Sequence, residues 1–126
     1  SFFEIYGGRL YDLLNNKNSN ITMKIEILKL LLNNYNLVQF DYKEKFIGNF
    51  SNALLNCLIS KNLLLRNITE KLIIKLNKAV NKEVYIEEIK NKDCNAKEKE
   101  YLFYKIYAYF YHEFLPSYVI LFLHLM

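Results

Sequence analysis

The sequence predicts a mainly α-helical chain built from helical hairpins, with one short β-strand near the N-terminus. Three observations support this fold class. The 126 residues include only three glycines and one proline, and such a scarcity of chain breakers favours long helices over many strands and turns. Apolar residues make up 52% of the chain, which is enough to form a buried core at this length. Along most of the chain these apolar residues recur at helical spacing.

The first residues form a segment of their own. Residues 2–6 (FFEIY) predict a buried strand that stops at the pair Gly7 and Gly8, and a short helical turn follows. The polar run 15–20 (NNKNSN) then predicts a linker. We therefore expect three parts, which are a strand-and-turn segment at 1–14, a linker at 15–20 and a helical domain at 21–126.

Three helices are predicted in the middle of the chain. The first covers residues 22–34, and the second starts near Asp41, which is spaced from Glu44 as in a capping box. A break at residues 60–62 separates the second helix from the third. The apolar residues expected on the buried faces are Ile25, Leu28, Leu31 and Leu32 in the first helix, Phe46, Phe50, Ala53, Leu54, Cys57 and Leu58 in the second, and Leu65, Ile68, Leu72, Leu76 and Ala79 in the third.

The C-terminal part of the chain is first highly charged and then aromatic. Residues 84–89 (VYIEEI) can form a helix or a strand, and residues 93–96 (DCNA) predict a loop or a helix start. The region 96–126 begins as an aromatic helix, which Pro116 ends or kinks. The apolar run after the proline is shorter than the roughly 20 residues that a spanning helix needs. We expect a buried last helix, with membrane contact through 101–126 or a truncated helix as the alternatives.

Composition and motifs give no support for catalysis. The formal net charge of +4 permits an acidic partner surface, but no run of five or six like charges predicts a nucleic-acid arm. His112 and His124 have no cysteine, serine or carboxylate placed by sequence to form a relay with them. Cys57 and Cys94 lack metal-binding spacing, and we expect two reduced thiols in an intracellular protein. The sequence predicts no catalytic residue, cofactor, metal ion or nucleic-acid partner.

The opening segment, S-F-F-E-I-Y-G-G-R-L-Y-D-L-L-N, resembles one segment of the kinesin motor head, over residues 1–15 only. That family repeats S-[FY]-x-E-I-Y-[NG]-[EG]-x-[IVL]-x-D-L-L at a central strand, and the glycine pair resembles the version in microtubule-depolymerising kinesins. The phosphate loop and the switch motifs N-x-x-S-S-R-S-H and D-L-A-G-S-E do not occur in this chain. The resemblance therefore implies a structural strand without an ATP site, and leaves open whether a parent protein is a kinesin ATPase. The residues at the family's positions are Ser1, Glu4, Ile5, Tyr6, Asp12, Leu13 and Leu14.

A second resemblance lies at residues 54–73. The run L-L-N-C-L-I-S-K-N-L-L-L-R-N-I-T-E-K-L resembles the turn of a HEAT-type repeat, L-x-x-L-x-D-x-N-x-x-V-R-x-x-A-x-x-x-L, with Ser60 in place of the aspartate and Thr69 in place of the alanine. Two antiparallel helices with one apolar stripe each cannot bury it alone, so such pairs stack on their neighbours. An ordinary helical hairpin is the alternative. The matching residues are Leu58, Asn62, Leu65, Arg66 and Leu72 or Ile73.

Both resemblances point to microtubules. Among HEAT-repeat modules, the tubulin-binding TOG domains bind through inter-helix turns, which correspond here to Lys61 and to the turn at 33–36. The predicted function is a non-catalytic, kinesin-like helical module, cytoplasmic and cytoskeletal, that binds tubulin or microtubules. We expect it to be a truncated or divergent fragment of a motor protein that lacks the ATP site. The predicted partner-binding residues are Lys61, Arg66 and Lys71. The alternatives are a generic helical scaffold that binds another protein and a membrane-associated protein.

Overall fold

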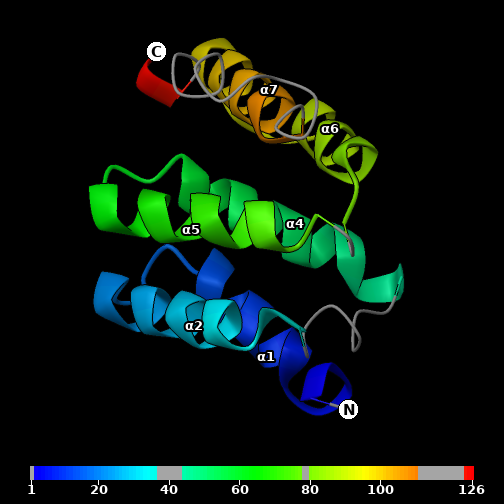
Figure 1. Cartoon of the computed structure of the whole chain (residues 1–126). Helices are drawn as coiled ribbons and strands as arrows, with labels where there is room; N and C mark the ends of the chain where they lie inside the picture. Colours follow the sequence, from blue (N-terminus) through cyan, green and yellow to red (C-terminus); the bar gives the residue numbers. More distant parts are fainter. Residues whose placement is uncertain (1, 37–43, 78–79, 111–123) are drawn as a thin grey trace.

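Helices make up the regular structure of the computed structural model (Figure 1), which describes residues 2–36, 44–77, 80–110 and 124–126. Over these ranges there is no β-strand, so the predicted mainly α-helical fold class is confirmed. The elements are α1 (Phe2–Asn15), α2 (Ile21–Asn33), α4 (Glu44–Leu58), α5 (Leu63–Lys75), α6 (Lys82–Lys90) and α7 (Ala96–Phe110).

The predicted N-terminal strand is wrong. Residues 2–6 lie in α1, and the helix continues through Gly7 and Gly8 to Asn15. A strand with no neighbour leaves its backbone N–H and C=O groups unpaired, whereas a helix pairs these groups within the segment. The two glycines weaken a helix without breaking it. Within the predicted linker at 15–20, the chain turns between α1 and α2 from Asn16 onward.

The helices pair into three hairpins, α1–α2, α4–α5 and α6–α7, which stack on one another (Figure 1). The second hairpin lies in the middle, with α4 packed between α1 and α6, and with α5 packed against α2. In contrast, α5 and α7 make little contact. The stack is therefore closely packed along the row α1–α4–α6 and opens along the other row between α5 and α7.

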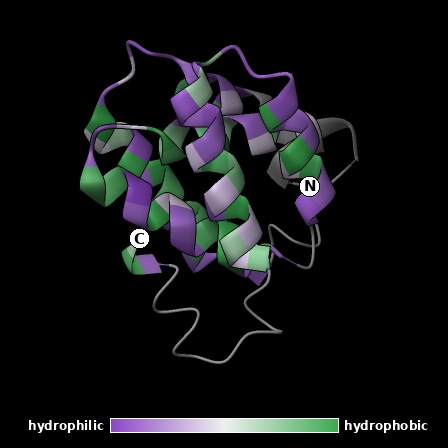
Figure 2. Cartoon of the chain, turned by 90° about the horizontal axis from the view of Figure 1, so that it is seen from above, coloured by the Kyte–Doolittle hydropathy of each residue, from purple (hydrophilic) through white to green (hydrophobic). Residues whose placement is uncertain are grey.

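One hydrophobic core runs through the three hairpins. The central helix α4 supplies the fully buried Phe50, Leu54 and Leu58. The ring of Tyr11 in α1 lies 5.3 Å from the ring of Phe50, centroid to centroid, and this contact joins the first hairpin to the second. Figure 2 shows hydrophilic residues concentrated in the connections between helices, with hydrophobic residues interleaved along the helices themselves.

Most of the predicted buried faces are confirmed. In α2 and α5 the expected stripes are buried, except that Leu32 is only half-buried. In α4 the expected residues from Phe50 onward are all buried. The side chains of Phe46 and Ala79 lie outside the described residues, as do Asp41 and its predicted capping box. Residues 84–89, left open as helix or strand, lie in the helix α6.

Four helices begin in the same way. The side-chain oxygen of an asparagine accepts a hydrogen bond from a backbone N–H two or three residues further on, at 2.7 to 3.2 Å. Asparagine is among the strongest N-cap residues because this bond satisfies an otherwise unpaired donor of the first turn. At α7, Glu98 Oε1 also accepts from the backbone N of its cap at 3.3 Å, which completes a capping box. The four caps are Asn20, Asn62, Asn81 and Asn95.

The C-terminal region is described through α7 and again at 124–126. The predicted loop or helix start at 93–96 is confirmed, because the chain leaves α6 and enters α7 there. Pro116 and its surroundings lie outside the described residues. Among the helices that the structure describes, none has both the length and the apolar character needed to cross a membrane.

Candidate functional site: the α5–α7 groove

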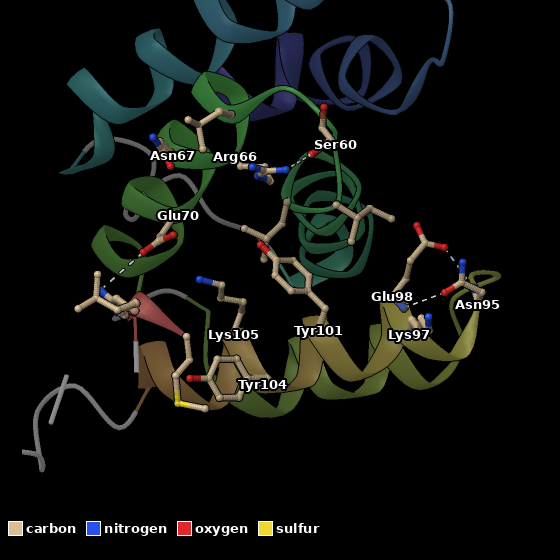
Figure 3. A pocket seen from close by; sticks show the side chains of 16 residues that line it. Ser60, Arg66, Asn67, Glu70, Asn95, Lys97, Glu98, Tyr101, Tyr104 and Lys105 are labelled. Carbon is tan, nitrogen blue, oxygen red and sulfur yellow. Dashed lines mark hydrogen bonds and ion pairs between the residues drawn. The ribbon is translucent and has the colours of Figure 1, made fainter. Parts of the chain in front are cut away.

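A cavity of about 720 Å³ opens where α5 and α7 diverge (Figure 3). We call this cavity the α5–α7 groove. Its walls come from α5, from the turn between α4 and α5, and from α7, and residues 124–126 line it as well. The charged and aromatic residues on which its chemistry depends are Arg66, Glu70, Lys97, Glu98, Tyr101 and Lys105.

The turn between α4 and α5 positions Arg66 on the groove wall. The Arg66 Nη1 donates to the carbonyl oxygen of Ser60 at 3.1 Å. The turn is itself held by Asn62, whose backbone N donates to Ser60 Oγ at 3.2 Å and whose side chain caps α5. A guanidinium carries five N–H donors, and in the described structure the Ser60 carbonyl is the hydrogen-bond acceptor of one of them. The other donors are available to a ligand.

Tyr101 and Lys105 form the opposite wall, one helical turn apart on α7. Both side chains point from α7 into the groove (Figure 3). Lys105 Nζ lies 5.8 Å from the centroid of the Tyr101 ring, within the range of a cation–π interaction. Burial raises the pKa of the Tyr101 phenol, while the Arg66 guanidinium opposes the rise and the Glu70 carboxylate adds to it. The phenol therefore stays protonated at neutral pH and can donate a hydrogen bond.

The two carboxylates of the groove have partners within the protein. Glu98 belongs to the capping box of α7, and Glu70 Oε1 lies 3.8 Å from His124 Nδ1, close enough for an ion pair when the imidazole is protonated. Burial, with a further contribution from Glu70, raises the pKa of Tyr109, whose ring lies edge-on to His124 at 6.1 Å. Lys97, in contrast, is exposed and makes no hydrogen bond or ion pair with the rest of the described chain. The groove thus offers more unpaired positive than negative charge.

The three predicted partner-binding residues do not come together in one site. Arg66 lines the groove, whereas Lys61 is exposed in the turn between α4 and α5 and lies outside the groove lining. Lys71 is also exposed, but five residues after Arg66 it points roughly 140° away around α5. Sequence reasoning missed the wall from α7. This wall includes Lys97, Tyr101 and Lys105. Their spacing of i, i+4 and i+8 would have placed them on one face of a helix.

The described residues offer little for catalysis. The structure brings the carboxylate of Glu70 beside His124, which sequence spacing did not predict, and His124 Nε2 is buried. Over the described ranges no group of three or more His, Cys, Asp or Glu residues could hold a metal ion. Cys57 and Cys94 are free thiols, and His112 lies outside the described residues.

Comparisons of the chain with protein-family models, with curated proteins and with solved structures gave no match. The fold and the site define the chain as a stack of three helical hairpins with an open groove between α5 and α7. The kinesin and HEAT resemblances stay predictions that depend on the residues quoted for them. The kinesin-like segment lies in a helix here, whereas the resemblance implied a strand.

Proposed function

We propose that this chain is a non-catalytic helical interaction module that holds a segment of another protein in the α5–α7 groove. One observation carries the proposal: the hairpins pack closely except between α5 and α7, where a cavity of about 720 Å³ is left. Stacked helical hairpins commonly bind partners on surfaces of this kind. Most side chains that line the groove are polar or charged, and they stand beside a smaller apolar part that includes Leu63, with 62% of its surface exposed. Aromatic and arginine side chains such as Tyr101 and Arg66 are enriched where proteins bind one another.

The length of the groove suits a short segment of chain. Its lining on α7 runs from Asn95 to Lys105, which spans about 15 Å at about 1.5 Å per residue. An extended chain at about 3.3 Å per residue covers the same length with roughly five residues.

Two neighbouring leucines allow a direct test. Leu63 and Leu64 are both exposed in the first turn of α5, but only Leu63 lines the groove. Peptides selected from a displayed random library on the wild-type chain should lose binding to the Leu63→Ser variant and keep binding to the Leu64→Ser control. Calorimetry with the selected peptides measures both affinities. The proposal fails if no peptide is enriched, or if both variants bind every selected peptide as the wild type does.

Microtubule binding is a second candidate function, in which the chain is a kinesin-like module of the cytoskeleton. The exposure of Lys61 in the turn between α4 and α5 favours it, together with the two resemblances. Co-sedimentation with microtubules and gel filtration with free tubulin, at low and moderate salt, test it. Binding should weaken with salt and with Lys61→Glu more than with the control Lys90→Glu, which lies exposed on α6. A folded chain that binds neither form of tubulin leaves only the first candidate.

A further inference from the structure

We infer that the segment held in the α5–α7 groove is acidic: an extended peptide whose carboxylates face Arg66 and Lys105, with an apolar side chain against Leu63 and Tyr101. This inference rests on the proposed function, and it adds the chemistry of the ligand. It comes from charge complementarity in the groove, from the geometry of the donors and from the exposed apolar surface beside them.

The ionisable side chains of the groove carry a small positive excess, because Arg66, Lys97 and Lys105 face two carboxylates, Glu70 and Glu98. Glu98 accepts a hydrogen bond in its own capping box, and Glu70 faces His124. Neither carboxylate pairs with Arg66, Lys97 or Lys105 in the described structure. A ligand carboxylate would therefore meet cations that are not already paired with a carboxylate of the groove.

The donors of the groove suit carboxylates. Arg66 is held in place by the Ser60 carbonyl through Nη1, so its remaining donors are oriented before a ligand arrives. A guanidinium edge binds a carboxylate through two parallel hydrogen bonds. Across the groove, Lys105 supplies a second cation and Tyr101 a phenolic donor (Figure 3). Two cationic walls with an apolar surface between them match a peptide in which acidic and apolar residues alternate.

A nucleic acid suits the groove less well. Glu70 and Glu98 line the same cavity as the cations and would repel a continuous phosphate backbone. A peptide can place its carboxylates at the cations and neutral residues at the two glutamates. The test therefore includes an oligonucleotide as a separate arm.

The experiment uses three fluorescein-labelled peptides and measures anisotropy at low and moderate salt. The acidic peptide is DEFELDE, its amide counterpart is NQFQLNQ, and DEAEADE lacks the apolar side chains. The acidic peptide should bind roughly tenfold more tightly than either of the others, and its binding should weaken with salt. Arg66→Gln and Lys105→Gln should each weaken binding roughly three- to tenfold. The matched control Lys71→Gln, exposed on α5 outside the groove, should leave the affinity unchanged. Circular dichroism confirms that each variant is folded. If Arg66→Gln does not fold, Arg66→Met, which keeps an unbranched apolar stem but removes the charge, replaces it and should weaken binding by the same factor.

The outcomes separate the inference from the proposed function. If NQFQLNQ binds as tightly as DEFELDE and Leu63→Ser weakens both, the groove binds peptides but the acidic preference is wrong. If Lys71→Gln weakens binding as much as Arg66→Gln, the attraction is a general effect of net charge and the inference is overturned. A single-stranded oligonucleotide that displaces DEFELDE and binds more tightly overturns it in favour of a nucleic acid. If none of the three peptides binds while library-selected peptides do, the inference fails and the proposed function stands.

Discussion

Gly48 in α4 lies directly beneath the end of the Glu88 side chain in α6, so that a Cβ atom on Gly48 would lie 2.8 Å from Glu88 Oε1. The obstructing atom is the far end of a flexible side chain, and the next nearest atom, Glu88 Cδ, would lie 3.8 Å away. Rotation of the Glu88 side chain would therefore make room for a methyl group at little cost.

Gly48→Ala should stabilise the protein by roughly 0.5–1 kcal/mol, because alanine loses less conformational entropy than glycine in a helix. Urea unfolding followed by circular dichroism measures the change. The same substitution in a Glu88→Ala background removes the obstruction and should give the full helix-propensity gain. Destabilisation that persists in that background would contradict the prediction.

The hydroxyl of Tyr85 is buried and has no hydrogen-bond partner within the described chain. Tyr85→Phe removes this hydroxyl and keeps the ring, which lies 5.7 Å from the Phe110 ring between centroids. Because an unpaired buried polar group costs about 1–3 kcal/mol, the variant should be more stable than the wild type by roughly 1 kcal/mol. Thermal unfolding measures this gain. Tyr85→Ala, which leaves a cavity, should instead cost about 3–5 kcal/mol, and a Tyr85→Phe variant less stable than the wild type would show that the hydroxyl has a partner in solution.

A polar network ties the three hairpins together. Lys92 Nζ, between α6 and α7, donates to Oδ1 of Asn52 at 2.9 Å and to Oδ1 of Asn56, both in α4. The Asn56 amide in turn donates to Asn15 Oδ1, at the end of α1, at 2.7 Å. Burial lowers the pKa of Lys92, and the nearby Cys94 and Glu88 oppose this change.

Lys92→Ala should destabilise the protein by roughly 1–3 kcal/mol, because hydrogen bonds to a charged group are lost and two amide oxygens lose their donor. The exposed Lys90, two residues earlier, provides the matched control, and Lys90→Ala should change the free energy of unfolding by less than about 0.5 kcal/mol. Urea midpoints of the two variants at neutral pH decide the matter. Equal effects would mean that the network contributes nothing beyond a surface charge.

The buried thiol of Cys57 predicts a loss of stability at alkaline pH. Burial raises its pKa from 9.0 to about 11, although the charges of Lys24 and Lys92 and a hydrogen bond with Thr69 oppose the rise. Between these two values the folded state keeps a proton that the unfolded state has released, so the free energy of unfolding falls as the pH rises. The loss should reach roughly 2–3 kcal/mol by pH 11.

Urea unfolding from pH 8 to 11 under reducing conditions measures this loss. Cys57→Ala should be less stable at pH 8 but should show a flatter curve between pH 9 and 10. Above that range the curve of this variant should fall as well, because burial also raises the pKa of Tyr85. Parallel curves for the wild type and Cys57→Ala between pH 9 and 10 would contradict the assignment to the thiol.

The central helices were predictable because each carries a long apolar stripe. The stripe from Ile25 to Leu31 covers about two helical turns and that from Leu65 to Leu76 about three, and the spacing of both fits a helix and not a strand. The short run 2–6 has no such length, and a short apolar run fits a strand and a buried helix equally well. Only the packing of α1 against α4 decides between them.

The groove was not predictable from local pattern, because it depends on the divergence of two helices far apart in the sequence. Searching for basic residues near the turn found Arg66, but the same criterion also selected Lys71, on another face of α5. The spacing of Lys97, Tyr101 and Lys105 identifies a shared face of α7, yet nothing in that spacing shows that the face looks toward α5.

The unequal packing of the two rows has a mechanical consequence. Since the third hairpin is attached mainly along the line where α4 meets α6, that line can serve as an axle, and a small rotation about it changes the distance between α5 and α7 while most core contacts are kept. The width of the groove then varies with the tilt of the third hairpin and is not fixed. The thickness of a bound segment then determines how far the third hairpin tilts away from the second.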